Sequence, residues 1–145
     1  MNNLITSIGL MSGTSCDGID ASIIKSDGKY KFHFIGNQFL PYDDKLKLKI
    51  ISLKEKINLN ADLEKNKLEI NALEKEITFL HAKIVNLIIE KNNLEKSQIE
   101  LIGFHGHTIF KSFKEKKTKQ IGDARLLSQL TNLSVVNNFR ESDIN

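Results

Sequence analysis

A bend rich in glycine and hydroxyl side chains joins two apolar segments near the N-terminus. The bend reads GLMSGTSCDGID at residues 9–20, and six of these twelve residues are Gly, Ser or Thr. The apolar segments at 4–10 and 19–25 are predicted to be strands, and a tight turn at 27–28 ends the second. Alternating aromatic residues at 30–36 predict a third strand. The sequence therefore predicts a three-stranded antiparallel meander whose first turn is this bend.

The middle of the chain is helical in character from about residue 46 to 93, after Pro41 ends the third strand. Apolar residues recur here at alternating spacings of three and four: Ile70, Leu73, Ile77, Leu80, Ile84 and Leu87. This spacing is typical of a coiled-coil seam. Further apolar residues at 85, 88 and 89 widen the stripe, which favours a helix buried in a globular core, with a coiled coil as the alternative.

The last third of the chain combines short strands with one helix. A buried strand is predicted at 100–104, a helix capped by Asp123 at 123–132, and a further strand at 134–138. The lysine-rich run at 114–119 is predicted to be a solvated loop rather than a contact to nucleic-acid phosphates. Three antiparallel strands followed by alternating helices and strands indicate an α/β layer fold.

Composition and charge argue against several classes of function. With 145 residues, 40% hydrophobic and 27% charged, the chain has the size and balance of one globular domain. Its net charge of +3 comes from scattered lysines, which argues against a nucleic-acid partner. No stretch approaches the roughly 18 apolar residues of a membrane span, and the N-terminus lacks the basic start of a secretory signal. We therefore expect a cytoplasmic protein without a membrane partner, in which the single Cys16 is a small packing side chain.

The composition of the bend suits the phosphates of a nucleotide. Glycines allow the backbone to approach an anion closely, and successive amides in such a turn form a concave anion site. The hydroxyls of Ser12, Thr14 and Ser15 add donors, and Asp17 and Asp20 can hold Mg²⁺ through water. The bend matches neither a Walker A loop nor a dinucleotide fingerprint. A simple hairpin with a polar tip is the alternative that the spacing alone leaves open.

The bend resembles the N-terminal signature of the anhydro-N-acetylmuramic acid kinase family, which is part of the actin, sugar-kinase and heat-shock-chaperone ATPase superfamily. Two further segments match this family in the right order. IGFHGHT at 102–108 resembles its GxHGQT element, and QIGD at 120–123 with VVNNFR at 135–140 and Asp143 resembles its QIGD…VVxDFRxxD element. The likeness therefore runs the length of the chain.

Membership of this family implies both a fold and a reaction. The fold is an α/β, ribonuclease H-like ATPase lobe: a mixed sheet with packed helices, in which residues 1–145 form the N-terminal lobe of a two-lobed sugar kinase and the second lobe is absent. The reaction is ATP-dependent phosphorylation of 1,6-anhydro-N-acetylmuramic acid. Water opens the anhydro bridge to give N-acetylmuramic acid 6-phosphate for cell-wall recycling. The implied cofactors are ATP and Mg²⁺.

The resemblance also assigns site residues. The ATP-binding positions are Gly13, Thr14, Ser15, Cys16, Asp17, Gly18, Ile19 and Asp20, and the magnesium ligands are Asp17 and Asp20. The motif positions near the sugar are His105, Asp123 and Arg140.

Each of the three sugar-site residues has a structural alternative. Arg140 can hold the lactyl carboxylate of the sugar, or pair with Glu141 or Asp143 on the surface. His105 can donate to a sugar oxygen from the end of its strand, or serve as a hydrogen-bonded structural residue. Asp123 can bond to the sugar or only cap the following helix.

The chain departs from the family pattern at several motif positions. His107 replaces the usual Gln, Lys111 and Phe113 stand where the family commonly has His and Pro, Arg125 falls in a pair that is usually small, and Asn138 replaces an Asp. A lysine in place of a titratable histidine alters both hydrogen bonding and local charge.

The end of the chain bears on activity. Family sequences continue into a glycine-rich GGxGAP stretch, the catalytic aspartate and the second lobe, whereas this chain ends at Asn145. We therefore expect the catalytic residues to lie beyond Asn145 and the isolated chain to have little activity. A C-terminal partner chain or a homodimer is expected to cover the exposed lobe interface. The alternative is a non-catalytic module that binds phosphate, or a helical interaction module built on residues 63–94.

Overall fold

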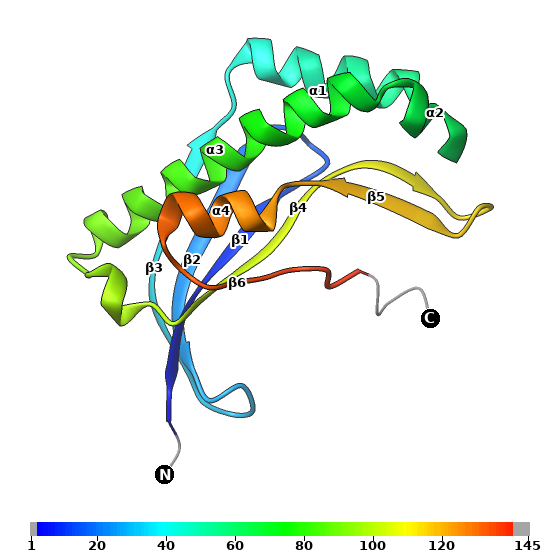
Figure 1. The fold of residues 1–145 in the computed structure, drawn as a ribbon. Coiled ribbons are helices and arrows are strands. Elements are labelled where there is room, and N and C mark those ends of the chain that lie inside the picture. The colour runs from blue at the N-terminus through cyan, green and yellow to red at the C-terminus, as the bar shows by residue number, and fades with distance from the viewer. Residues whose placement is uncertain (1–2, 141–145) are drawn as a thin grey trace.

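A six-stranded mixed sheet carries the helices on one of its faces (Figure 1). The computed structural model describes residues 3–140. The strands are β1 (Ile5–Ser12), β2 (Gly18–Ser26), β3 (Phe32–Pro41), β4 (Leu101–Ser112), β5 (Lys117–Ile121) and β6 (Val135–Val136). The helices are α1 (Asp44–Lys56), α2 (Asn60–Lys65), α3 (Lys67–Lys91) and α4 (Ala124–Thr131), with a short 3₁₀ turn at Lys96–Gln98.

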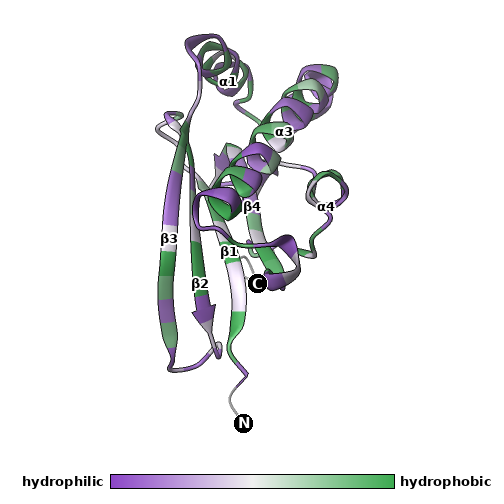
Figure 2. Ribbon diagram, turned by 90° about the vertical axis from the view of Figure 1, so that its left-hand side faces the viewer, coloured by the Kyte–Doolittle hydropathy of each residue, from purple (hydrophilic) through white to green (hydrophobic). Residues whose placement is uncertain are grey.

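The order of strands confirms the predicted mixed α/β fold. The sheet runs β3-β2-β1-β4-β5, with β6 paired to β4. Strands β1, β2 and β3 form the predicted antiparallel meander, and β4 returns parallel to β1. Such a parallel return needs a crossover, which the helical section between β3 and β4 supplies. Figures 1 and 2 show α1, α3 and α4 on the same side of the strands.

Helix α3 is a core helix, which rules out the coiled-coil alternative for this segment. The side chains of Ile77, Ile84, Val85 and Ile88 have no exposed surface. Residues on more than one side of the helix are buried because α3 packs against the sheet and also against α1 and α4. A coiled coil would leave Val85 and Ile88 in water.

The helical section is not continuous, which corrects the prediction for residues 46–93. Helix α1 ends at Ile57, and a further break at Asn66 separates α2 from α3. The side chain of Asp62 accepts hydrogen bonds from the amides of Asn58 and Leu59 at 3.0 and 2.9 Å. Local side-chain bonding of this kind competes with the helix, which explains the interruption.

The region after residue 104 contains more strand than predicted. Strand β4 continues to Ser112 and places His105 inside the strand rather than at its end, and β5 occupies half of the run predicted as a loop. The extension is stabilised by burial of Ile109 and Phe110. Lysines on β5 suit an edge strand, because their charge discourages pairing with another chain.

The face of the sheet opposite the helices carries small side chains at its centre. A hollow of about 180 Å³ lies over this face and is lined by Ser7, Ile8, Gly9, Ser22, Ile24, Leu101 and Gly103. A methyl group built on Gly103 would lie 3.8 Å from the ring of Phe139, so the segment after β6 approaches this open face. Within the described residues, no helix has the length and apolar character to cross a membrane.

Candidate nucleotide and sugar site

The loop at residues 13–17, between β1 and β2, presents a short polar tip. The amide of Cys16 donates to the carbonyl oxygen of Gly13 at 3.1 Å, and Cys16 itself is left-handed with φ of 58°. This turn exposes Thr14 and Ser15, whereas the Cys16 amide is no longer available to a ligand. The loop therefore offers fewer free amides than a full phosphate loop.

The ionised carboxylate of Asp17 lies at the end of the exposed tip. The hydroxyl of Ser15 donates to Oδ1 of Asp17 at 2.7 Å. This hydrogen bond, followed by backbone amides, lowers the pKa of Asp17 from its usual range, so the side chain is anionic at neutral pH. Among the loop side chains, Thr14, Ser15 and Asp17 are exposed and can reach a ligand.

Five other positions assigned to the nucleotide have a buried side chain, as in Ser12, Cys16 and Ile19, or have none, as in Gly13 and Gly18. Ser12, Cys16 and Ile19 are at most 5% exposed. A Cβ on Gly18 would collide with the carbonyl oxygen of Leu40, so this glycine is required for close packing of β2 on β3. The prediction that Ser12 donates to phosphate is wrong, because its hydroxyl is buried against Tyr42 and His107.

A buried polar cluster lies beneath the loop. Oγ of Ser12 is 2.7 Å from the hydroxyl of Tyr42 and 2.8 Å from Nδ1 of His107. Nε2 of His107 is 3.7 Å from Sγ of Cys16. Burial lowers the pKa of His107 to about 4 and raises that of Tyr42 to about 12, so both are neutral near pH 7. Burial also raises the pKa of the Cys16 thiol, which agrees with a packing role rather than a reactive one.

Lys54 lies beside the loop. A hollow of about 330 Å³ separates the loop from α1 and is lined by Thr14, Ser15, Cys16, Ile51, Lys54 and Glu55. The positive charge of Lys54 acts on both Cys16 and His107: in each it is the second influence on the pKa, after burial. A cation, two hydroxyl groups and the loop backbone thus border one space.

Two of the three predicted sugar-site residues, His105 and Arg140, interact through charge. His105 is half-buried on β4, and its pKa is lowered first by burial and then by the charge of Arg140. The amide of Gln120 lies 3.2 Å from the Thr108 hydroxyl and 3.5 Å from Nδ1 of His105, so its bond to the histidine is long. His105 is therefore neutral near pH 7 and close enough to Arg140 to respond to its charge.

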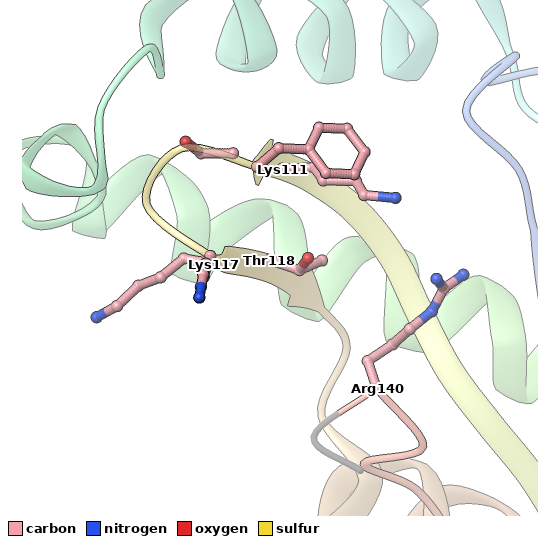
Figure 3. Close-up of a pocket in the computed structure, with 7 residues that line it drawn as sticks. Lys111, Lys117, Thr118 and Arg140 are labelled. Carbon is pink, nitrogen blue, oxygen red and sulfur yellow. The ribbon is translucent and has the colours of Figure 1, made fainter. Parts of the chain in front are cut away.

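Arg140 contributes to a hollow of about 300 Å³ at the β4–β5 hairpin. The hollow is lined by Lys111, Ser112, Phe113, Lys116, Lys117, Thr118 and Arg140, four of which are cationic. Arg140 extends from the C-terminal segment toward β4 (Figure 3). The ammonium of Lys111 lies 4.7 Å from the centroid of the Phe113 ring, a cation–π geometry. Two of the positions that depart from the family pattern thus form one wall of a cationic hollow.

The third predicted residue, Asp123, caps α4. Its Oδ1 accepts from the amide of Leu126 at 2.9 Å, and its own amide donates to the Thr78 hydroxyl at 3.0 Å. Of the other substituted positions, Arg125 is exposed on α4 and Asn138 is exposed with φ of 64°. Glu141 and Asp143, the alternative partners of Arg140, lie outside the described residues.

Comparison with known proteins settles the family. A sequence model of the anhydro-N-acetylmuramic acid kinase family matches residues 5–145. The chain belongs to this family. The anhydro-N-acetylmuramic acid kinase of Pelagibacter ubique is 47% identical over 144 residues, a match covering 99% of this chain and 38% of the relative. The kinases of that name from Rhizobium etli and Rhodopseudomonas palustris are 36% and 35% identical, with matches covering 99% and 97% of this chain and 39% and 38% of each relative. The chain thus spans less than two fifths of these relatives.

Within this kinase family, magnesium is the implied metal. The described residues contain no group of three or more His, Cys, Asp or Glu side chains arranged to hold an ion. Asp17 and Asp20 are nevertheless exposed carboxylates, which are the hard oxygen donors that Mg²⁺ prefers. An ionised Asp17 at the tip would repel phosphate oxygens unless a cation lay between them. The chemistry of these two donors is therefore of the kind that Mg²⁺ binds.

Sequence reasoning missed Tyr42 and Lys54 as parts of this site. Tyr42 follows Pro41 outside every family motif and carries no pattern of its own. Lys54 is four residues after the buried Ile50 and next to the buried Leu53, so it borders the apolar stripe of α1. The sequence signal for Lys54 was its position at the edge of a buried stripe. Lysines at such positions are also common in helices that have no binding role.

Proposed function

We propose that this chain is the nucleotide-binding lobe of an ATP-dependent kinase that phosphorylates 1,6-anhydro-N-acetylmuramic acid. The reaction opens the anhydro bridge with water and gives N-acetylmuramic acid 6-phosphate, which returns cell-wall sugar to metabolism. Family membership supports the reaction, and the exposed loop tip bordered by Lys54 is the observation that supports nucleotide binding. We place the reaction in the cytoplasm, where ATP is available.

The loop would hold the phosphates by hydrogen bonds and charge. Thr14 can donate its hydroxyl directly, whereas Ser15 must turn its hydroxyl away from Asp17 to do so. Lys54 supplies a point charge on the other side of the hollow. Phosphoryl transfer depends on such positioning and charge stabilisation, because little covalent chemistry falls to the protein.

Asp17 and Asp20 would hold magnesium. The ion would neutralise phosphate charge as the transferred group moves. The protein's own contribution is the hydrogen bond from Ser15, which keeps Asp17 ionised and oriented at the exposed tip.

The cationic hollow would hold the acid group of the sugar. Anhydromuramic acid carries a lactyl carboxylate, and Arg140 can bind such a group through two parallel N–H donors. Lys111 and Lys117 add charge around the same space. A neutral His105 next to Arg140 can exchange a hydrogen bond with a sugar hydroxyl. Asp123 uses Oδ1 for its cap, so Oδ2 is the atom proposed to reach the sugar.

We also propose that this chain alone turns over slowly. The general base that activates water, and the rest of the adenosine pocket, would come from the part of the family that this chain does not span. The open face of the sheet is a candidate contact for that part, for a C-terminal partner chain or for a second copy.

Two measurements test the proposal. Calorimetric titration of the chain with ATP and Mg²⁺ should show binding. ADP release with anhydromuramic acid should be slow for the chain alone and should rise when the unmatched part of the Pelagibacter ubique kinase is added. Rapid turnover by the chain alone would overturn the proposal of slow turnover, and no binding of ATP would overturn the nucleotide role. Binding without any turnover in the mixture would favour a non-catalytic phosphate-binding module.

A further inference from the structure

The loop at residues 13–17 contacts two residues that are distant in the sequence, Tyr42 and His107. These contacts occur at the beginning, within and at the end of the loop. Ser12 precedes the loop and contacts both Tyr42 and His107 through its hydroxyl. Cys16 in the loop contacts His107 through its thiol. The carbonyl oxygen of Asp17 at the end of the loop accepts from the amide of Tyr42 at 2.9 Å. The conformation of the loop is therefore tied to side chains that lie outside it.

The donors and acceptors in this cluster form one consistent chain. The thiol of Cys16 donates to the carbonyl oxygen of Thr14 at 3.4 Å, so Sγ is left as an acceptor for Nε2–H of His107. Nδ1 of His107 then accepts from the hydroxyl of Ser12, which in turn accepts from the Tyr42 hydroxyl. In this arrangement each donor has one acceptor, and the arrangement requires a neutral His107. A charged ring would carry a proton on Nδ1 and would reverse the contact with Ser12.

A bulge in β4 puts His107 in this place. Leu10 of β1 pairs with Phe104, but Ser12 pairs with His107, so β4 contains one extra residue between the two pairs. Gly106 takes φ of 73° there, and a Cβ at this position would collide with the carbonyl oxygen of Ile121. Without the extra residue His107 would not lie opposite Ser12. Gly106 therefore permits the bulge that places the ring of His107 beneath the loop.

We propose that His107 is a positioning residue for the nucleotide loop: it joins Ser12 to Cys16 and holds the Thr14–Ser15 tip in the shape that receives phosphate. The ring does not touch the ligand and acts only through the loop. This inference rests on the proposed ATP-binding role, but the loop geometry can be measured without ATP. A Gln side chain at this position could likewise accept from Ser12 and donate to Cys16.

The test compares His107→Leu and His107→Gln in the full 145-residue chain. The matched control is His81→Leu, since His81 is also buried and its pKa is also lowered to about 4 by burial, but it belongs to α3 and bonds to the carbonyl oxygen of Ile77. The first readout is amide hydrogen exchange at residues 13–17 without nucleotide. The second is the dissociation constant for ATP with Mg²⁺.

We expect His107→Leu to speed loop exchange and to weaken ATP binding by about tenfold each, the usual effect of a lost buried hydrogen bond. His107→Gln should restore both to within about threefold. His81→Leu should lower thermal stability and change neither. The inference is overturned if His107→Leu changes loop exchange and ATP binding no more than His81→Leu does.

Two further outcomes are decisive. If His107→Leu does not fold, Ser12→Ala replaces it, because this variant removes the hydroxyl that donates to Nδ1 of His107; unchanged loop exchange would then overturn the inference. If the unmodified chain binds no ATP, the proposed function fails, and the exchange rates alone decide whether His107 positions the loop.

Discussion

The ring of His81 on α3 packs edge-on against the ring of Phe104 on β4, with centroids 4.9 Å apart. His81 is 1% exposed, and its Nε2 has no hydrogen-bond partner among the described residues. Burial, with smaller contributions from the neighbouring His105 and His107, lowers its pKa to about 4 despite the hydrogen bond to the Ile77 carbonyl oxygen, which acts in the opposite direction. Three histidines whose pKa values are lowered thus lie around one strand of the sheet.

These histidines make stability depend on pH. In the unfolded chain a histidine titrates near 6.5, so between pH 4 and 6.5 the unfolded state binds more protons than the folded state. The free energy of unfolding should therefore fall as pH drops through this window, by up to about 1.4 kcal/mol per pH unit for His81 and for His107. Urea denaturation at pH 7, 6 and 5 measures the slope.

Replacing one buried histidine should flatten that dependence. His81→Gln should reduce the slope between pH 5 and 6.5, whereas His33→Gln, at an exposed position on β3, should leave it unchanged. The lowered pKa values of Asp17, Asp27 and Asp62 matter at lower pH, below their ordinary value of 3.8. A slope that is the same in wild type and His81→Gln would contradict the assignment.

Gly106→Ala should be strongly destabilising. At φ of 73° an alanine is strained, and its Cβ would meet the Ile121 carbonyl oxygen, so β5 would have to move away from β4. We expect a loss of about 2 kcal/mol or more in the free energy of unfolding. Gly9→Ala is the control, because nothing lies within 4 Å of a Cβ built there. Equal losses in the two variants would show that the β4 bulge is not constrained as described.

The sequence predicted the elements that rest on local periodicity. The meander followed from alternation and turn residues, and α3 followed from apolar spacing wide enough to require burial on several faces. Strand β5 was missed because its lysines resemble a solvated run, and only pairing with β4 makes them an edge strand. Such pairing is a long-range contact that no local pattern encodes.

The candidate site was predictable in position but not in mechanism. The loop and the two residues His105 and Arg140 were assigned by motif, and the structure adds only that the charge of Arg140 lowers the pKa of His105. The contact of Ser12 with His107 joins residues 95 positions apart, and no local pattern predicts that these hydroxyl and imidazole groups meet. Asp123 had two possible roles: its bond to the Leu126 amide shows the cap, and its bond to the sugar stays a proposal.

Lys54→Met should weaken ATP binding. The substitution keeps the length of the side chain but removes the charge that borders the loop hollow. Loss of a charged hydrogen bond to phosphate is worth about 1.5–3 kcal/mol, or roughly a tenfold to hundredfold rise in the dissociation constant. Lys49→Met is the control on the same helix, because Lys49 pairs with Glu76 at 2.7 Å. If both variants bind ATP equally well, Lys54 does not contact the phosphates.

Arg140→Gln should separate two sugars that differ only in the lactyl group. Anhydromuramic acid carries this carboxylate and anhydro-N-acetylglucosamine lacks it, so only the first can form a paired bond with the guanidinium. We expect the variant to lose about tenfold or more in affinity for the first sugar and little for the second, measured by calorimetry with ATP and Mg²⁺ present. Arg125→Gln, at an exposed position on α4, is the matched control. Equal losses for both sugars would mean that Arg140 shapes the hairpin hollow without recognising the carboxylate. Lys111 and Lys117 would then be the remaining cations of the hollow to test against the same two sugars.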